Sequence, residues 1–132
     1  MVFVDTSALY SSLDRDDRSH AMALDCWTAL RRSRESLVTT NYVVLESCAL
    51  LQRRLGIGAV RSLTENLLPT ISVQWVTPED HTRALATVLA ANRRKLSLVD
   101  CTSFAVMRSG QIHRAFAFDQ HFDEQGFETK LA

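Results

Sequence analysis

The sequence has little of what membrane, secreted and multidomain proteins require. No apolar run approaches the ~18 residues of a bilayer crossing, and the N-terminus lacks the basic-then-apolar pattern of a signal peptide. Only two prolines and four glycines are present, and no low-complexity segment or repeat marks a linker. The 132 residues, 46% of them hydrophobic, predict one domain spanning 1–132, in the cytoplasm and away from membranes.

Cysteine and net charge are also scarce. Cys26, Cys48 and Cys101 are odd in number, widely spaced and set in apolar segments, which favours buried thiols in a reducing compartment over disulfides or a zinc site. Fifteen basic residues balance fifteen acidic ones, so the net charge neither attracts nor repels nucleic acid. Nucleic-acid binding would therefore depend on local clusters, such as those at 31–34, 53–54 and 93–95, whose ordinary role is that of a solvated helix end.

What the sequence does have is an alternation of short strands and longer helices. The pattern predicts strands at 2–4, 37–39, 71–76 and 115–118, with a candidate short strand at 127–129. It predicts helices over 20–32 and 42–55, a helix start at 77–80 and a candidate capping box at 97–100. We expect an α/β fold, a three-layer α/β/α sandwich around a mostly parallel sheet, with its site beyond the carboxyl ends of the strands.

Three aspartates occupy positions where such a site would form. Asp5 follows the first predicted strand, Asp119 follows the strand at 115–118, and Asp100 stands in the candidate capping box. Each has an ordinary structural interpretation, because aspartate at a helix start accepts a backbone N–H of the first turn. Taken singly, these aspartates predict only helix caps.

Glu46 does not fit that interpretation. It lies inside a predicted helix with apolar residues at i−3, i−4, i+3 and i+4, so we expect the helix and this carboxylate to be largely buried. An unpaired buried carboxylate costs several kcal/mol at least, by desolvation. An ion pair with Arg53 or Arg54, about two turns on, is one explanation. A cation shared with the three aspartates explains all four acids together, and we favour it.

Convergence of these acids would make a metal site. Carboxylates without accompanying cysteine suit Mg²⁺ or Mn²⁺, and four acids gathered without an ion would repel one another. We therefore predict Asp5, Asp100 and Asp119 as metal ligands and, with Glu46, as the catalytic residues of a phosphodiester hydrolase. Thr6 and Ser7 would support the acids through hydrogen bonds.

Four segments carry a family resemblance. In order and spacing, VFVDTSAL, TTNYVVLES, SLVDCTSFAVM and FAFDQHFDEQGF resemble the blocks of PIN-domain ribonucleases of the bacterial VapC toxin type, across essentially the whole chain. The resemblance implies a PIN-like fold, RNA cleavage dependent on Mg²⁺ or Mn²⁺, a homodimer and a cognate antitoxin. It makes the four acids the catalytic quartet and Ser7 their support. It leaves Asp123 outside the core set, and His121 is interpreted as a surface or structural residue rather than a base.

Other classes remain in view. A phosphoacceptor receiver domain would need an acidic pair after the first strand and a lysine after the last, whereas this chain has Thr6 and Ser7 after Asp5, and Asp119 in its final block. The Asp-x-Asp phosphatase pattern fails at Ser7. A PIN-like RNA-processing nuclease that is not a toxin stays open. A non-catalytic module binding nucleic acid or a partner is the last alternative, and loss of an acid would be its signature.

Two surfaces complete the predictions. Arg53, Arg93 and Arg94 flank the Glu46 and Asp100 segments, so we expect them to hold phosphates of RNA, preferably single-stranded or looped, near the acids. Apolar residues of the first two helices exceed what one thin layer over the sheet needs, which suggests association, although burial of all of them in the core explains them equally well. The family resemblance implies a homodimer and an antitoxin segment in a groove of these helices. The apolar residues concerned are Leu9, Leu13, Met22 and Trp27.

Overall fold

A parallel sheet forms the frame of the molecule. The computed structural model describes residues 1–131, and within them four strands lie in the order β3-β2-β1-β4, with every neighbouring pair parallel. The strands are β1 (Val2–Val4), β2 (Leu37–Thr40), β3 (Ser72–Gln74) and β4 (Arg114–Phe116). The predicted α/β fold with a mostly parallel sheet is confirmed.

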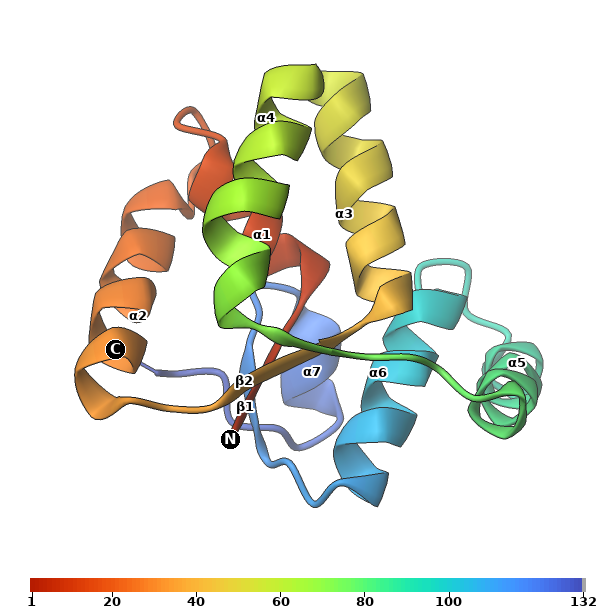
Figure 1. Ribbon diagram of the computed structural model, residues 1–132. Helices are drawn as coiled ribbons and strands as arrows, with labels where there is room; N and C mark the ends of the chain where they lie inside the picture. The colour runs from red at the N-terminus through yellow and green to blue at the C-terminus, as the bar shows by residue number, and fades with distance from the viewer. Residues whose placement is uncertain (132) are drawn as a thin grey trace.

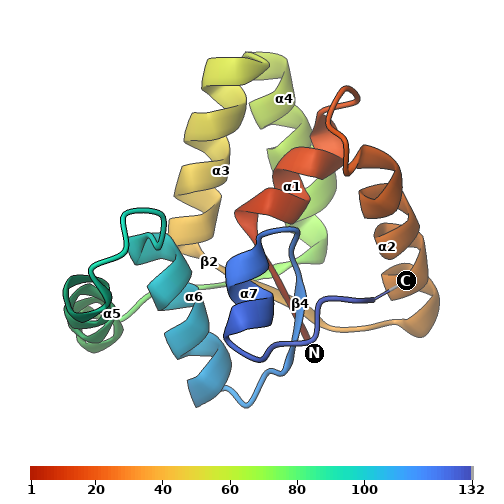
Figure 2. The ribbon, with the colours of Figure 1, turned by 180° about the vertical axis from the view of Figure 1, so that it is seen from behind.

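Helices cover both sides of this sheet. Figures 1 and 2, which view the molecule from opposite directions, show α7 on one side of β1 and β2 and α4 on the other. The elements are α1 (Thr6–Leu13), α2 (His20–Ser33), α3 (Asn41–Arg54), α4 (Ile57–Ser62), the π-helical turn η1 (Leu63–Leu67), the 3₁₀ turn η2 (Leu68–Thr70), α5 (Pro78–Ala91), α6 (Leu98–Ser109) and α7 (Gln120–Glu124). No helix within residues 1–131 combines the length and apolar character that crossing a bilayer requires.

The core explains why β1 is an uninterrupted apolar run. Val2, Phe3 and Val4 are fully buried, since β1 is paired on both edges and covered on both faces. Leu9 and Trp27 also belong to this core: Leu9 is fully buried, and the Trp27 indole N–H donates to Ser12 Oγ at 2.6 Å. For these two residues the core interpretation is confirmed, because both side chains cover the sheet. Met22 is exposed, as an association surface requires, and Leu13 is half-buried.

The structure departs from the expected elements at the sheet margins. β3 is an exposed edge strand of three residues, shorter than the predicted 71–76. The candidate strand at 127–129 is reduced to one bridge between Arg114 and Glu128. The turns of α4, η1 and η2 were not predicted, because Gly56, Gly58 and Pro69 interrupt the apolar periodicity over that segment.

Candidate metal centre

The carboxyl ends of the central strand β1 and of its neighbour, the edge strand β4, position two of the predicted acids. Asp5 follows β1 directly and Asp119 follows β4 after two residues. β1 and β4 pair in register from Val2 opposite Arg114 to Val4 opposite Phe116, and the Asp5 N–H donates to the Phe116 carbonyl at 3.0 Å. Rigid pairing of buried strands therefore holds these chain positions at one edge of the sheet.

Each aspartate caps a helix with only one of its oxygens. Asp5 Oδ2 accepts from the Ser7 N–H at 3.1 Å, and Asp119 Oδ1 accepts from the His121 N–H at 2.9 Å. Asp100 completes the predicted capping box, its Oδ2 accepting from the Ser97 N–H at 3.1 Å. The other oxygen of each carboxylate accepts no hydrogen bond from the described chain. Capping and ligation are therefore compatible uses of the same side chains.

Burial and mutual repulsion raise the pKa of the two most enclosed acids. Asp5 is 3% exposed, and burial raises its pKa to about 7, opposed by the Ser7 hydrogen bonds and reinforced by the charges of Asp100 and Glu46. Burial likewise raises the pKa of Asp100, with Asp119 and Glu46 adding to the rise. Each of the four predicted acids thus acts electrostatically on another member of the set, as a shared site requires.

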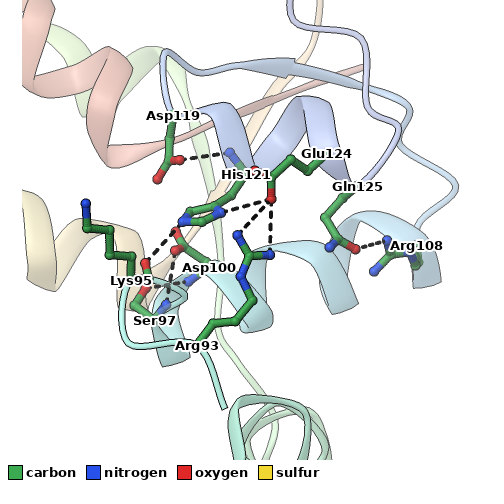
Figure 3. A network of polar contacts seen from close by, with 9 residues as sticks. All are labelled: Arg93, Lys95, Ser97, Asp100, Arg108, Asp119, His121, Glu124 and Gln125. Atoms are coloured by element: carbon green, nitrogen blue, oxygen red, sulfur yellow. Dashed lines mark hydrogen bonds and ion pairs between the residues drawn. The ribbon is translucent and has the colours of Figure 1, made fainter. Parts of the chain in front are cut away.

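His121 lies closer to the acids than the sequence suggested. One ring nitrogen and one oxygen each of Asp100 and Asp119 lie within 4.8 Å of one another. Figure 3 shows these side chains gathered between the first turns of α6 and α7. Nε2 of His121 lies 3.2 Å from the Lys95 carbonyl, and Nδ1 lies 3.4 Å from Glu124 Oε2. The ring is buried, so it is not a surface residue; the available signal was its spacing of two from Asp119.

Glu46 lies within electrostatic reach of the other acids, but its helix is less buried than the sequence predicted. The prediction that its helix is buried all round was wrong: Leu45 is 70% exposed, and Glu46 itself is half-buried. It extends from the second turn of α3, immediately after β2, toward the other acids. It forms no ion pair with Arg53 or Arg54 within the described chain; Arg54 instead lies 5.4 Å from the centre of the Tyr10 ring.

A family comparison adds to this geometry. The model of the PIN domain family matches residues 2–128. The chain belongs to the PIN domain family. Its similarity to members of the VapC toxin type, predicted from four sequence segments, is confirmed.

Relatives in this PIN family are similar along their full length. The 23S rRNA-specific endonuclease VapC20 of two Mycobacterium tuberculosis strains, CDC 1551 / Oshkosh and H37Rv, is 35% identical over 128 residues, which cover 96% of this chain and 95% of that protein. The crystal structure of M. tuberculosis VapC20, a sarcin–ricin loop cleaving toxin, superposes with a TM-score of 0.87 at 32% identity and covers all of both chains. The fold prediction is confirmed by that superposition.

The hydroxyl residues after Asp5 behave differently from each other in this PIN domain. Ser7 Oγ donates to Asp5 Oδ2 at 2.6 Å and accepts from the Phe118 N–H at 2.9 Å, so it joins the end of β1 to the segment after β4. Thr6 does not form the predicted hydrogen bond within residues 1–131. Its Oγ1 is buried without a partner there, as is Ser47 Oγ beside Glu46.

Two of the predicted substrate-binding arginines follow α5, and the third lies at the end of α3. Arg93 follows α5 and pairs with Glu124 at 3.2 Å, which links it through Glu124 to His121 (Figure 3). Arg94 is exposed on the same turn. Arg53 is exposed in the last turn of α3, two turns beyond Glu46.

Asp123, kept outside the quartet, accepts a hydrogen bond from Thr129 at 2.5 Å and is exposed.

Proposed function

We propose that the chain, as a single nuclease domain over 1–132, is an endoribonuclease dependent on Mg²⁺ or Mn²⁺ and the toxin of a bacterial toxin–antitoxin pair. The observation that carries the proposal is a set of four acids around Asp5 and Asp100, none ion-paired within the described chain, with one capping-free oxygen on each aspartate. Oxygen donors of this kind fit a hard divalent cation.

In this proposal each side chain has a defined task. Asp5, Asp100 and Asp119 would hold the ion, and Glu46 would orient the attacking water. When bound, the ion stabilises negative charge on the phosphoryl oxygens. Ser7 keeps Asp5 in place, and the product carries a 5′-phosphate.

The comparisons supply the substrate class. The relatives are described as a 23S rRNA-specific endonuclease and a sarcin–ricin loop cleaving toxin. An RNA hairpin with that loop is therefore the first substrate to test, since an unpaired loop exposes its backbone to a recessed site. We propose that cleavage of such a substrate takes place in the cytoplasm.

Association belongs to the same proposal. Trp75 is 75% exposed and Leu89 is 73% exposed, which supports a homodimer contact. Met22, 59% exposed, borders a hollow of about 570 Å³ against β4, which supports docking of an antitoxin segment. Light scattering of the chain alone and with its antitoxin should give a dimer and a larger complex; a monomer under both conditions would exclude this part of the proposal.

The test of the metal site combines cleavage with thermal unfolding. Parent protein should cleave the hairpin with Mg²⁺ or Mn²⁺ and stop in excess EDTA. A divalent ion at about a hundred times its Kd should raise the Tm of the parent by roughly 10 °C, from about 2.7 kcal/mol of linkage. Asp5→Asn, which still caps α1, should lose both effects. Equal cleavage in EDTA, or an equal Tm shift in Asp5→Asn, would show that the site is wrongly assigned.

A further inference from the structure

A cavity lies directly beside the acids and has no role in the chemistry described so far. It measures about 400 Å³, within the roughly 300–1,000 Å³ of small-molecule pockets. The first turns of α3, α5 and α6 supply its walls, and we call it the α3–α6 pocket. Its lining residues are Tyr42, Leu45, Glu46, His81, Leu98 and Val99.

The α3–α6 pocket adjoins the candidate metal centre through Glu46. Glu46 belongs to both, and Val99 immediately precedes Asp100 in the first turn of α6. The charge of Glu46 acts on Asp5 and on Asp100, so the pocket opens within electrostatic reach of both. Whatever fills the pocket is thus attached to, or adjacent to, the group bound at the acids.

Beside Glu46, the walls combine a fixed aromatic ring with aliphatic surface and the polar ring of His81. The Tyr42 hydroxyl lies 2.6 Å from His81 Nδ1, and the two rings meet edge-on at 79° with centres 5.8 Å apart. This contact between α3 and α5 fixes both rings. Because it uses Nδ1, His81 Nε2 is left for a ligand, as a donor or an acceptor according to the tautomer. Leu98 and Val99 complete an apolar surface.

We propose that the α3–α6 pocket holds one unstacked nucleobase of the RNA, on a nucleotide next to the cleaved phosphate, and thereby sets sequence preference. The inference rests on the proposed ribonuclease function. A nucleobase matches the pocket because it has a flat face for the Tyr42 ring and the aliphatic wall, and a polar edge for His81 Nε2. The ribose also joins the nucleobase to a phosphate, so a base in the pocket can belong to a nucleotide whose phosphate lies at the neighbouring acids.

The experiment compares one cleavable RNA with versions that carry an abasic nucleotide at each position flanking the cleaved bond. Parent protein should lose roughly tenfold in kcat/KM at one of these positions, since a base stacked on an aromatic side chain contributes about that factor or more. Tyr42→Ala should cleave the intact RNA with a raised KM and lose most of this discrimination. Tyr42→Phe, which keeps the ring, should retain it.

His81→Ala tests the polar edge independently of the ring. It should keep the abasic penalty but reduce the preference among the four bases at that position. Thr87→Ala, an exposed substitution on the same helix, is the matched control and should change neither. Thermal unfolding of each variant verifies that it is folded.

A binding measurement without cleavage separates the two proposals. Fluorescence anisotropy of the same RNAs in EDTA should show the same abasic penalty for the parent and its loss in Tyr42→Ala. If Tyr42→Ala and His81→Ala both keep the parental base preference, the pocket assignment is overturned while the ribonuclease function stands. If the parent binds with a base preference but cleaves no RNA with either metal, the ribonuclease function is overturned and the pocket stands. Absence of RNA binding overturns both.

Discussion

The carboxylates at the two ends of the sheet lie in opposite electrostatic environments. At the amino ends of β1 and β4, Glu35 accepts from the Met1 ammonium at 3.1 Å and from Arg114 at 2.5 Å, and these cations hold its pKa below the ordinary value. At the carboxyl ends, Asp5 and Asp100 have no cationic partner within the described chain, and burial raises their pKa values. Within the described chain, the fold therefore contains an acid that is ion-paired at one end of the sheet and acids without an ion pair at the other.

This difference distinguishes stabilising charges from functional ones. The ion pair between Glu35 and Arg114 joins the segment before β2 to the start of β4, and each charge there has a partner. Acids that repel one another in a buried position cost stability, and such arrangements are concentrated at functional sites. The carboxyl end thus has the electrostatics of a site that lacks its counter-charge.

The sharpest test of the comparison exchanges one acid at each end for its amide. Asp100→Asn should reduce RNA cleavage at least about a thousandfold, because several kcal/mol of charge stabilisation are lost at about 1.4 kcal/mol per factor of ten. Glu35→Gln should leave cleavage unchanged. Asp123→Asn, an exposed acid near the site, is the matched control. Initial rates of hairpin cleavage are measured for the three variants and the parent. Substantial activity in Asp100→Asn would show that the acid with the raised pKa is not needed for catalysis.

A second test uses the pH dependence of stability. The pKa of Asp5 is about 7 in the folded state and near 3.8 otherwise, so between these values the unfolded chain releases a proton that the folded chain keeps. The free energy of unfolding of metal-free protein should therefore fall as pH rises from about 4 to 7, by up to about 4 kcal/mol. Asp5→Asn should remove the share of this decline that Asp5 contributes, and Asp100, whose pKa is also raised, should maintain the remainder.

Glu35 acts with the opposite sign in the same titration. Its pKa is lowered, so its stabilisation is present above the unfolded pKa and disappears as pH falls through the folded value. Urea unfolding of parent, Asp5→Asn and Glu35→Gln from about pH 2 to 8 in chelator separates the two contributions, because that of Glu35 is lost below its ordinary pKa of 4.5. A parent whose stability does not decline toward pH 7 would contradict the burial argument for Asp5.

Ser7→Ala should produce an intermediate effect. It removes the hydroxyl that donates to Asp5 and accepts from the Phe118 N–H, which leaves a backbone donor without its partner. We expect a loss of about 1–3 kcal/mol in the free energy of unfolding and roughly 10–100-fold in cleavage, because Asp5 loses its fixed orientation. Ser33→Ala, on α2, is the control. Unchanged cleavage in a destabilised Ser7→Ala protein would make Ser7 structural only.

The smallest effects should come from the arginines, in a defined order. Arg94→Ala should weaken RNA binding a few-fold and reduce the salt dependence by about one phosphate contact. Arg93→Ala should do less, since Glu124 already pairs with this charge, and Arg53→Ala least, since it lies two turns beyond Glu46. Affinity measured over a range of salt concentrations gives this order; equal slopes for all three variants would assign them to solvated helix ends.

The sequence predicted what depends on local pattern. An apolar triplet followed by an acid predicts β1 with Asp5 at its end, and the four ordered segments indicated the family. Contacts between distant segments were not predictable. The His121 ring contacts the Lys95 carbonyl, 26 residues earlier in the chain, and Tyr42 contacts His81, 39 residues later. The sequence also overestimated the burial of α3, because apolar residues such as Leu45 can be exposed on a helix that covers one side of a sheet.

The pairing of β1 with β4 also governs when the centre is assembled. Ser7 bonds to Phe118, 111 residues later, and Asp5 to Phe116, so these contacts of β1 require the segment around β4. Contacts of such long sequence separation form late, and a chain emerging from the ribosome makes them only after β4 has been synthesised. A growing or truncated chain that ends before β4 therefore has Asp5 without Asp119, so it lacks the complete catalytic set.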